Sequence, residues 1–429
     1  MKKFIISLLQ KRAKVVLDKF KPRVVAITGS VGKTSAKQAI ALVLSTKYKI
    51  RTAEKNFNNE IGVPLTILGM KSPGRNPFGW LTLFWKSYFI KTYPEMLILE
   101  YGADHPGDIK NLCDLASPDV AIITGISPVH AEFFKDIDHL ADEKSEIIKR
   151  LPDNGVAILN GDDKRVLTMQ TLYQSFMTYG TKETDIQADE ITLSTRLDDH
   201  FSPGELFIKT HAVIKLKDKE VGRLELKNAI GYASVLACLS ALTVADHFGI
   251  SFAMAIQKLN SDFRAMPGRL NPIAGIKGSL IIDDSYNAAP LAMQNGLDVL
   301  KSFSLSTDDD RRIAVLGQMA ELGQYTENEH RLIGMKVAEC ADLFLAVGEN
   351  MRIAVESAKE SGLDPNAIEW FANSEEAGRY LDREVKTGDI VYVKGSQSTR
   401  MEKVVKDIMA EPARADEILV RQDEKWLKV

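Results

Sequence analysis

The sequence lacks several features, and each absence excludes a class of protein. No run of about 18 or more uncharged apolar residues occurs, so no membrane-spanning helix is expected. The net charge is only −3, which gives no reason to expect nucleic acid as a partner. Cysteine is scarce and widely spaced, which excludes a disulfide framework and a Cys-x-x-Cys metal site and predicts three buried thiols, at Cys113, Cys238 and Cys340.

What is present is ordinary for a globular protein. Hydrophobic residues make up 45% of the chain and charged residues 26%. A length of 429 residues is too great for one compact domain and predicts two or three. No internal repeat, low-complexity tract or coiled-coil heptad is present. With reduced cysteines and no cleavable signal peptide, we expect a cytoplasmic protein, and we expect a monomer.

The first 22 residues predict a basic amphipathic helix. A signal peptide is excluded because Lys11, Arg12 and Lys14 interrupt the apolar run and no cleavage site of small residues follows. The helix has two interpretations: it packs on the next domain, or residues 1–20 touch an anionic membrane surface. Segment 71–95 is rich in aromatic residues and leaves the same two alternatives open. The apolar positions of the helix are Phe4, Ile5, Leu8, Leu9, Val15 and Val16.

The pattern along the chain predicts an α/β protein with two parallel-sheet domains. Short apolar runs alternate with helix-length polar segments, which is typical of βαβ units. We expect a central P-loop ATPase domain over residues 23–270, with strands at 24–28, 96–100, 120–124 and 156–160. ELFIKT and HAVIKLK, between residues 180 and 226, predict antiparallel strands added at one edge of this sheet.

The remainder of the chain predicts a second, smaller Rossmann-like domain. An Ala-rich segment, residues 228–248, predicts a buried helix. The following RAMPGRLNP breaks regular structure and predicts the joint between the domains. Beyond it, over residues 271–429, four apolar strands are expected, at 280–284, 312–317, 343–348 and 390–395.

The strongest chemical signal is VVAITGSVGKTSAKQAI, a strand that runs into a glycine-containing loop and then a helix. Main-chain N–H groups of such a loop and the positive end of the helix can hold phosphate. Lys33 is expected to reach the outer phosphates of ATP and Thr34 to bind Mg²⁺. The loop is shorter than the general P-loop pattern, because Ile27 stands where the first glycine is expected. The nucleotide-binding residues predicted here are Gly29, Ser30, Val31, Gly32, Lys33, Thr34 and Ser35.

An acidic residue follows the second predicted strand, MLILE. Ligands collect at the carboxyl ends of strands in open α/β sheets, and Glu100 occupies that position. Mg²⁺ prefers oxygen ligands, so Thr34 and Glu100 form a plausible pair of ligands.

Beyond these residues, the sequence resembles the Mur ligases, and within them the branch that adds D-alanyl-D-alanine. The resemblance extends from residue 24 to about 405. Matching segments follow the order of the family, and three of them (IDDSYNAAP, GQMAELG and VKGSQSTRME) favour this branch over ligases that add one amino acid. The others include TGSVGKTSAKQAI, NFNNEIGVPLTIL, LEYGADHPGDI, PVHAEFF, EKSEII, ILNGDD, PGRL and ENEHRLIG.

The resemblance implies an ATP-dependent amide ligase. The carboxylate of a muramoyl-peptide precursor would attack the γ-phosphate of ATP, and the amine of D-Ala-D-Ala would displace phosphate from the acyl phosphate. Two Mg²⁺ ions are expected in the family. Thr34 and Glu100 match ligands of the first ion, and His130 matches a ligand of the second. Lys144 resembles a lysine that the family carries as a carbamate, which gives Lys33, His130 and Lys144 catalytic roles.

The resemblance also assigns residues around the nucleotide and the dipeptide. Asn228 is similar to an asparagine at the adenine side, although Lys227 and Gly231 depart from the pattern around it. Arg269 and Asp284 match positions that reach the phosphates and ribose from the domain joint. The candidates for the dipeptide pocket are Asn287, Lys394 and Ser396.

One departure from the family is large. Full-length relatives carry an N-terminal domain that holds the uridine end of the precursor, whereas here the phosphate loop follows one short basic helix. The alternative is therefore a related ligase that acts on another carboxylate. A P-loop ATPase that moves a partner is a second class, and it needs no amine. A catalytically inactive scaffold is disfavoured, because the phosphate loop and metal-ligand positions are retained.

Overall fold

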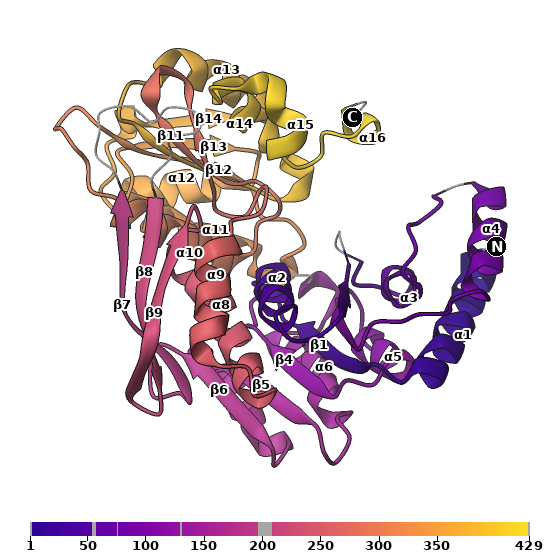
Figure 1. Ribbon diagram of the computed structural model, residues 1–429. Coiled ribbons are helices and arrows are strands. Elements are labelled where there is room, and N and C mark those ends of the chain that lie inside the picture. Colours follow the sequence, from indigo (N-terminus) through magenta and orange to yellow (C-terminus); the bar gives the residue numbers. More distant parts are fainter. Residues whose placement is uncertain (1, 54–56, 75, 129–130, 196–207, 428–429) are drawn as a thin grey trace.

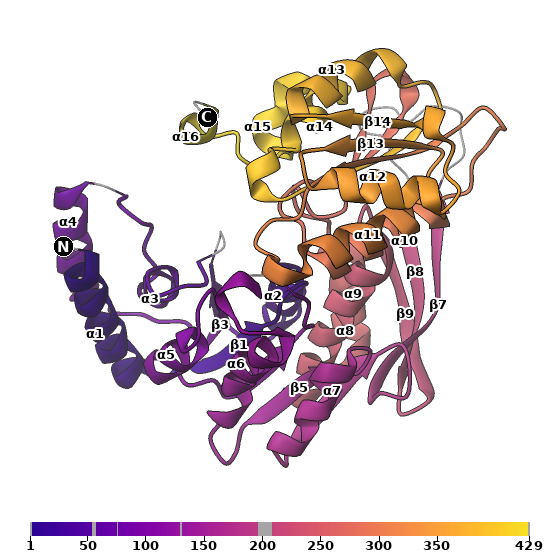
Figure 2. The same cartoon turned by 180° about the vertical axis from the view of Figure 1, so that it is seen from behind.

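The computed structural model describes residues 2–53, 57–74, 76–128, 131–195 and 208–427 (Figure 1). Over these residues the chain forms two sheets, each covered by helices on both faces (Figures 1 and 2). The predicted α/β class with two parallel-sheet domains is therefore confirmed. No helix among the described residues is long and apolar enough to cross a membrane.

The first sheet has nine strands over the described residues. The strands from β2 to β7 lie parallel, and β7 to β9 are antiparallel. The connections from β1 to β6 contain helices, as crossovers between parallel strands do. From edge to edge the strands are β2 (Ile50–Thr52), β3 (Met96–Glu100), β1 (Arg23–Thr28), β4 (Val120–Ile123), β5 (Val156–Asn160), β6 (Phe176–Gly180), β7 (Ile186–Thr195), β8 (Ile208–Leu216) and β9 (Lys219–Lys227).

The four predicted strands of this sheet are confirmed. The predicted antiparallel strands at one edge are confirmed as β7, β8 and β9, although the described parts of ELFIKT and HAVIKLK form one strand, β8, and not two. Apolar side chains of β1, β3, β4 and β5 are buried on both faces, as a parallel sheet requires.

Helices cover both faces of the first sheet. One face is covered by α2 (Lys33–Leu44), α8 (Gly231–His247) and α9 (Phe252–Asp262). The other is covered by α1 (Lys2–Phe20), α3 (Gly62–Leu68), α5 (Asp108–Leu115), α6 (Ile137–Lys149) and α7 (Lys164–Thr168), with α4 (Pro77–Ser87) beside α1. The Ala-rich helix is thus confirmed as buried. All three cysteines are buried free thiols, as predicted.

The second sheet has six strands over the described residues, two more than predicted. The four predicted strands are β11 (Leu280–Asp284), β15 (Ile390–Lys394), β12 (Arg312–Gly317) and β13 (Leu343–Val347). The two additional strands are at the edges: β10 (Asn271–Ala274) pairs antiparallel with β11, and β14 (Ile368–Phe371) pairs parallel with β13. Both are only four residues long, and β10 contains Pro272 while β14 is half-buried, so neither gives a long apolar run.

Helices also cover both faces of the second sheet. One face carries α10 (Pro290–Ser302), α11 (Thr326–Ala338) and α12 (Met351–Glu360); the other carries α13 (Ser374–Glu384) and α14 (Glu402–Ile408). Two short helices, α15 (Ala415–Ile418) and α16 (Glu424–Leu427), end the described chain. The predicted joint lies between α9 and β10, so the chain passes from one sheet to the other once.

Candidate active site

The carboxyl ends of four neighbouring parallel strands bring the candidate residues together. The phosphate loop follows β1, Glu100 ends β3, Thr124 follows β4, and Asn160 ends β5. Because these strands are parallel, all four positions lie at one edge of the sheet, where open α/β sheets bind ligands.

The loop between β1 and α2 depends on two glycines. Gly29 has a φ of 144°, and a Cβ on it would lie 2.2 Å from Thr124 Oγ1. Gly32 has a φ of 80°, in the left-handed region. At both positions a side chain would strain the backbone, and at Gly29 it would also collide with the loop after β4.

Hydrogen bonds from the segment after β4 hold the phosphate loop in place. The main-chain N–H of Ser30 donates to the Gly125 oxygen at 2.6 Å, and the Ser30 hydroxyl donates to the Ser127 oxygen at 2.9 Å. The Thr124 hydroxyl donates to the Val31 oxygen at 2.5 Å. The loop is thus fixed before any ligand arrives, with the amino-terminal end of the twelve-residue helix α2 behind it.

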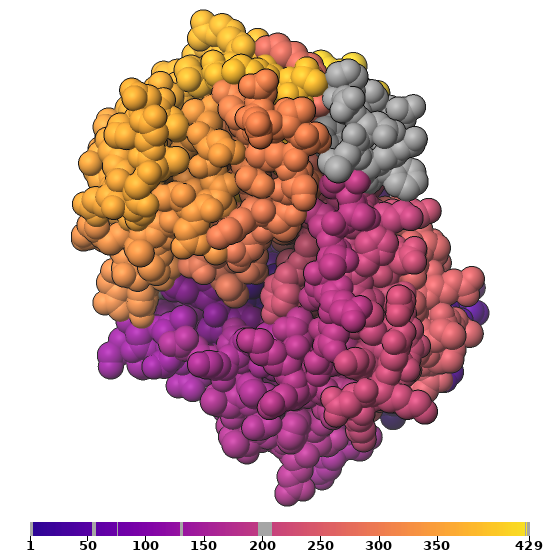
Figure 3. All heavy atoms as spheres, turned by 90° about the vertical axis from the view of Figure 1, so that its left-hand side faces the viewer, coloured from indigo at the N-terminus to yellow at the C-terminus, as the bar shows by residue number. Residues whose placement is uncertain are grey.

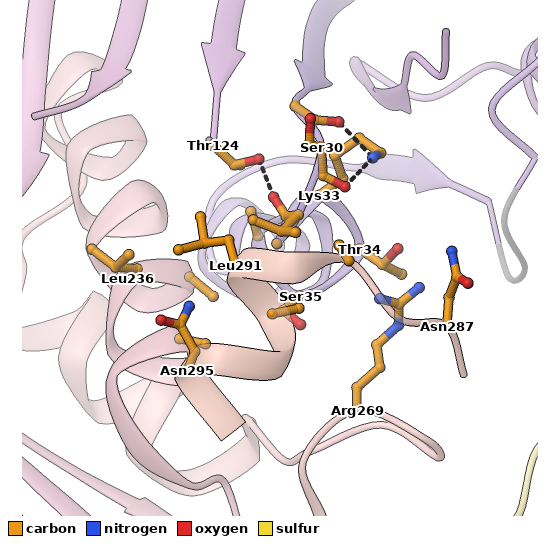
Figure 4. A pocket seen from close by; sticks show the side chains of 18 of the residues that line it. Ser30, Lys33, Thr34, Ser35, Thr124, Leu236, Arg269, Asn287, Leu291 and Asn295 are labelled. Carbon is orange, nitrogen blue, oxygen red and sulfur yellow. Dashed lines mark hydrogen bonds between the residues drawn. The ribbon is translucent and has the colours of Figure 1, made fainter. Parts of the chain in front are cut away.

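Lys33 bends back over this loop (Figure 4). Its ammonium donates to the Gly29 oxygen at 2.6 Å and to the Ser30 oxygen at 3.2 Å. Burial lowers the pKa of Lys33, while the Glu100 carboxylate acts in the opposite direction. The ammonium therefore lies against the loop, beside two of its main-chain oxygens.

Glu100 faces the start of α2 from β3. The Thr34 hydroxyl donates to Glu100 Oε2 at 3.2 Å, and the Lys37 ammonium lies 3.4 Å from the same oxygen. Burial opposes ionisation of Glu100, but Lys37, Lys33 and Arg269 outweigh it, and the pKa of this carboxyl is lowered. Glu100 is therefore an anionic oxygen donor beside a hydroxyl, and such a pair fits a Mg²⁺ ion that keeps several waters and binds phosphate.

One cavity of about 690 Å³ joins the phosphate loop to the second half of the chain. The space-filling view shows the hollow where the second half, drawn orange, meets the first (Figure 3). Arg269 and Asn287 point from the second half toward the start of α2 (Figure 4). The predicted residues that line the cavity are Gly29, Ser30, Val31, Gly32, Lys33, Thr34, Ser35, Glu100, Lys144, Arg269, Asp284, Asn287 and Lys394.

Asp284 and Lys394 are bound to each other. The Lys394 ammonium donates to Asp284 Oδ2 at 2.6 Å and to the Asn287 oxygen at 2.8 Å. Asp284 also accepts from the Tyr392 hydroxyl and from the main-chain N–H of Leu270. Burial raises the pKa of Asp284, and the Lys394 ammonium opposes that shift. Both carboxylate oxygens are thus used within the protein, which fixes the domain joint against the loop after β11.

Lys144 lies on α6 and is buried at the edge of the cavity. Burial lowers its pKa to about 7, and the Lys33 ammonium shifts it in the same direction. An exposed lysine is almost entirely protonated at neutral pH, but Lys144 has a substantial neutral fraction, which is the nucleophilic form of an amine.

Two predicted residues do not line the cavity, and one lies outside the described chain. Asn228 has a φ of 52° in the turn between β9 and α8, where its N–H donates to Ile208 and its oxygen accepts from Ala265. Ser396 is buried in the loop after β15 and pairs with Ser398. His130 is not among the described residues.

Several cavity residues were not predicted. Asn160 at the end of β5 donates to the Thr124 oxygen at 2.7 Å, and Asp162 accepts from the Tyr232 hydroxyl at 2.6 Å. The rule that identified Glu100 also applies to ILNGDD, since it follows a parallel strand. Tyr232 carries no such signal, because its place depends on how α8 packs. The same part of the cavity is lined by Tyr179, Ala233, Leu236, Leu291 and Asn295.

Comparison with known families covers most of the chain. The family model for the Mur ligase middle domain matches residues 27–236, and the model described as Mur ligase, glutamate ligase domain, matches residues 268–397. Both match regions contribute to the cavity.

Individual relatives are similar over nearly the whole chain. The UDP-N-acetylmuramoyl-tripeptide–D-alanyl-D-alanine ligase of Bacillus subtilis is 28% identical over 95% of this chain and 80% of its own length. The enzyme of the same name from Escherichia coli is 30% identical over 90% of this chain and 76% of its own. The solved structure of MurF ligase from Thermotoga maritima in complex with ADP superposes with a TM-score of 0.76 and 26% identity, covering 94% of this chain and 83% of that one.

Proposed function

Because this chain belongs to the Mur ligase family of acid–amino-acid ligases, we propose that it adds D-alanyl-D-alanine to a UDP-N-acetylmuramoyl-tripeptide at the expense of ATP. The step belongs to the synthesis of peptidoglycan precursors. The relatives named above carry out this reaction by name, and the segments that favour this branch lie in the second half of the chain.

One observation carries the proposal: a preformed phosphate loop shares a cavity with a cation supplied by the domain joint. Lys33 lies on the loop, and Arg269 points toward it from the domain joint. A transferring phosphoryl group is stabilised mainly by positioning and positive charge, which this arrangement offers from two sides.

Other parts of the cavity wall fit the nucleobase of ATP and the incoming dipeptide. We assign the nucleobase of ATP to the apolar part formed by Ala233, Leu236 and Leu291, where Asn295 offers a donor and an acceptor. We assign the carboxylate of the incoming dipeptide to the neighbourhood of Asn287 and Lys394. Lys394 is already paired with Asp284, so its role there is to position the Asn287 loop.

Magnesium would be held by Thr34 and Glu100, together with nucleotide phosphates and water. The ion would neutralise charge on the phosphates during transfer. Among the described residues no group of three His, Cys, Asp or Glu side chains could hold a metal by itself. The second ion, with His130 as a ligand, rests on the family resemblance.

Lys144 is the proposed site of carbamylation. Its amine attacks carbon dioxide, a C–N bond forms, and one proton leaves, so that a cation becomes an anionic oxygen donor. Only the neutral amine reacts, and a pKa of about 7 supplies that form. A carbamate would also relieve the repulsion between the Lys144 and Lys33 ammonium groups.

The proposed reaction has two steps. An oxygen of the tripeptide carboxylate attacks the γ-phosphorus, the bond to the β-phosphate oxygen breaks, and ADP leaves. The dipeptide amine then attacks the acyl carbon, loses a proton and expels phosphate as the amide forms. The acyl phosphate must be kept from water, and the position of the cavity between the two halves favours that.

We propose that the chain has three functional parts. Residues 1–22 form an amino-terminal helix, residues 23–270 form the domain that binds ATP, and residues 271–429 form the domain that binds the dipeptide.

The test is phosphate release from ATP and Mg²⁺ with D-alanyl-D-alanine and the muramoyl tripeptide supplied separately and together. Release that requires both, with a product heavier by one dipeptide, is expected. If the rate of phosphate release does not depend on D-alanyl-D-alanine, the ligase proposal is overturned in favour of an ATPase. Activity with a different carboxylate acceptor would correct the acceptor alone.

Two variants sharpen this test. Lys33→Met should abolish phosphate release, since it removes the cation over the loop. Lys149→Met, which changes an exposed lysine on α6, is the matched control and should leave the rate unchanged. Equal rates in both variants would contradict the role of the phosphate loop.

A further inference from the structure

Helix α4 is apolar on two opposite faces. Leu83 and Ser87 are buried, and Trp80 and Phe84 pack against the core of the first sheet. The opposite face carries Phe78, Leu81 and Trp85, at spacings that place them on one stripe, and the stripe continues into Tyr88 and Phe89. Phe78 is 78% exposed and Trp85 63%. A helix that serves only the core of its own domain needs one apolar face, whereas the side chains of this second face remain largely exposed among the described residues.

Helix α1 lies beside α4 and is linked to it by hydrogen bonds and a cation–π contact. The Arg12 guanidinium donates to the Ser87 hydroxyl at 2.8 Å and to the Ser87 oxygen at 2.6 Å, and it lies 4.0 Å from the centre of the Tyr88 ring. The buried face of α1 consists of Leu9, Ala13, Val16 and Leu17, which agrees with the first of the two interpretations of this helix, packing on the next domain.

Near its amino end α1 also exposes apolar side chains. Phe4 is 72% exposed, and Leu8 is exposed one turn later. Figures 1 and 2 show α1 and α4 side by side at the side of the molecule away from the second sheet. We call the exposed apolar residues of the two helices the α1–α4 surface: Phe4, Leu8, Phe78, Leu81, Trp85, Tyr88 and Phe89.

The charge around this surface differs from that of the rest of the chain. Residues 1–23 contain eight Lys or Arg and one Asp, and residues 71–93 contain four Lys or Arg and no acidic residue. The two segments together have a net charge of +11, although the whole chain has −3, so the remaining residues carry −14. Among these cations Lys3, Lys11 and Lys86 are exposed.

We propose that the α1–α4 surface docks on an anionic phospholipid membrane, with α4 lying in the plane of the interface. Aromatic side chains prefer the boundary between headgroups and acyl chains, and lysines are attracted to anionic headgroups. Helix α4 has eleven residues, too few to span a bilayer but enough to lie in its surface. The excess of negative charge elsewhere disfavours docking through any other face.

Membrane docking of this kind would not require the cavity to open. The surface is built from α1 and α4, whereas the cavity is lined by the strand ends, α2, α8 and the second half of the chain. The proposal is therefore independent of the substrate assigned above, and either can fail alone.

The experiment is flotation of the full chain with phosphatidylcholine vesicles, with and without phosphatidylglycerol. We expect the protein to float with the anionic vesicles only, and added salt to reduce the floating fraction. Phe78→Ser with Trp85→Ser should reduce apparent vesicle affinity about ten-fold or more, since two exposed aromatic side chains are removed. The matched control is Leu332→Ser with Met335→Ser, two exposed apolar residues on α11.

Tryptophan fluorescence distinguishes insertion of the α1–α4 surface into the bilayer from electrostatic binding to the vesicle surface. The chain has four tryptophans, and only Trp85 lies on the α1–α4 surface. Anionic vesicles should shift its emission to shorter wavelength, and Trp85→Phe should abolish the shift while flotation persists. Thermal melting of every variant shows that it is folded.

Two results would overturn the proposal. One is failure of the intact chain to float with anionic vesicles, and the other is equal flotation of the Phe78→Ser, Trp85→Ser variant. If the intact chain does not float but is dimeric by sedimentation, and the same variant is monomeric, the α1–α4 surface binds a second copy instead.

Discussion

Replacing Lys144 with methionine should stabilise the protein at neutral pH, by an amount that falls as pH rises. The side chain is 2% exposed, and its pKa is lowered from 10.5 to about 7. Above pH 7 the folded protein has largely released the Lys144 proton, whereas the unfolded chain keeps it up to pH 10.5. The unfolded state thus binds more protons in this window, so the unfolding free energy of the unchanged protein increases with pH.

The magnitude follows from the size of the shift. A shift of 3.5 pKa units, each equivalent to about 1.4 kcal/mol, corresponds to about 4 kcal/mol of destabilisation at pH 7 and about 2 kcal/mol at pH 9. Methionine has similar length and no charge to bury, so it removes the penalty at both pH values. The advantage of Lys144→Met should therefore shrink by about 2 kcal/mol between pH 7 and pH 9.

The assay is urea unfolding in metal-free buffer without carbon dioxide, at pH 7, 8 and 9. Lys149→Met on the same helix is the control, because this exposed lysine should give a difference that does not depend on pH. An advantage of Lys144→Met that stays constant from pH 7 to 9, or a variant less stable than the unchanged chain at pH 7, would refute the reasoning.

Three further predictions concern the site and its support. Gly29→Ala should weaken nucleotide binding at least about ten-fold in a filter assay, because the new methyl group collides with Thr124. A dissociation constant within about two-fold of that of the unchanged protein would show that the loop can move to accommodate the methyl group. Lys33→Met should weaken ATP binding more than ADP binding by calorimetry, and an equal loss would place the ammonium away from the outer phosphate. Glu402→Gln should lower the unfolding free energy by about 3 kcal/mol, since it leaves the buried Arg421 guanidinium without its carboxylate; a loss below about 1 kcal/mol in urea unfolding would contradict this.

The amino-terminal part of the site could be predicted from sequence because its signals are local. A strand, two glycines and a lysine at a helix start stand within seventeen residues, and Glu100 directly follows an apolar run. The pairing of Asp284 with Lys394 could not be predicted in this way. Their contact arises because β11 and β15 are neighbours in a register that places Asp284 opposite Lys394, and that register is set by the whole second sheet.

Other differences have equally specific causes. Asn228 is assigned to the adenine side by the family resemblance, and the structure places it in a turn in the left-handed conformation, outside the residues that line the cavity. Strand β14 was missed because it lies at a sheet edge, where Glu369 and half-buried neighbours interrupt the apolar pattern. Asp162 was missed although the rule that identified Glu100 applied to it as well.

The single passage of the chain between the sheets has a thermodynamic consequence. Each half supplies walls to the same cavity, so a ligand that touches both halves binds one relative arrangement of them better than others. Two such ligands select the same arrangement, and each must then raise the affinity for the other by an equal factor. Nucleotide and acceptor should therefore bind with positive heterotropic cooperativity, and a compound that bridges the halves should compete with both.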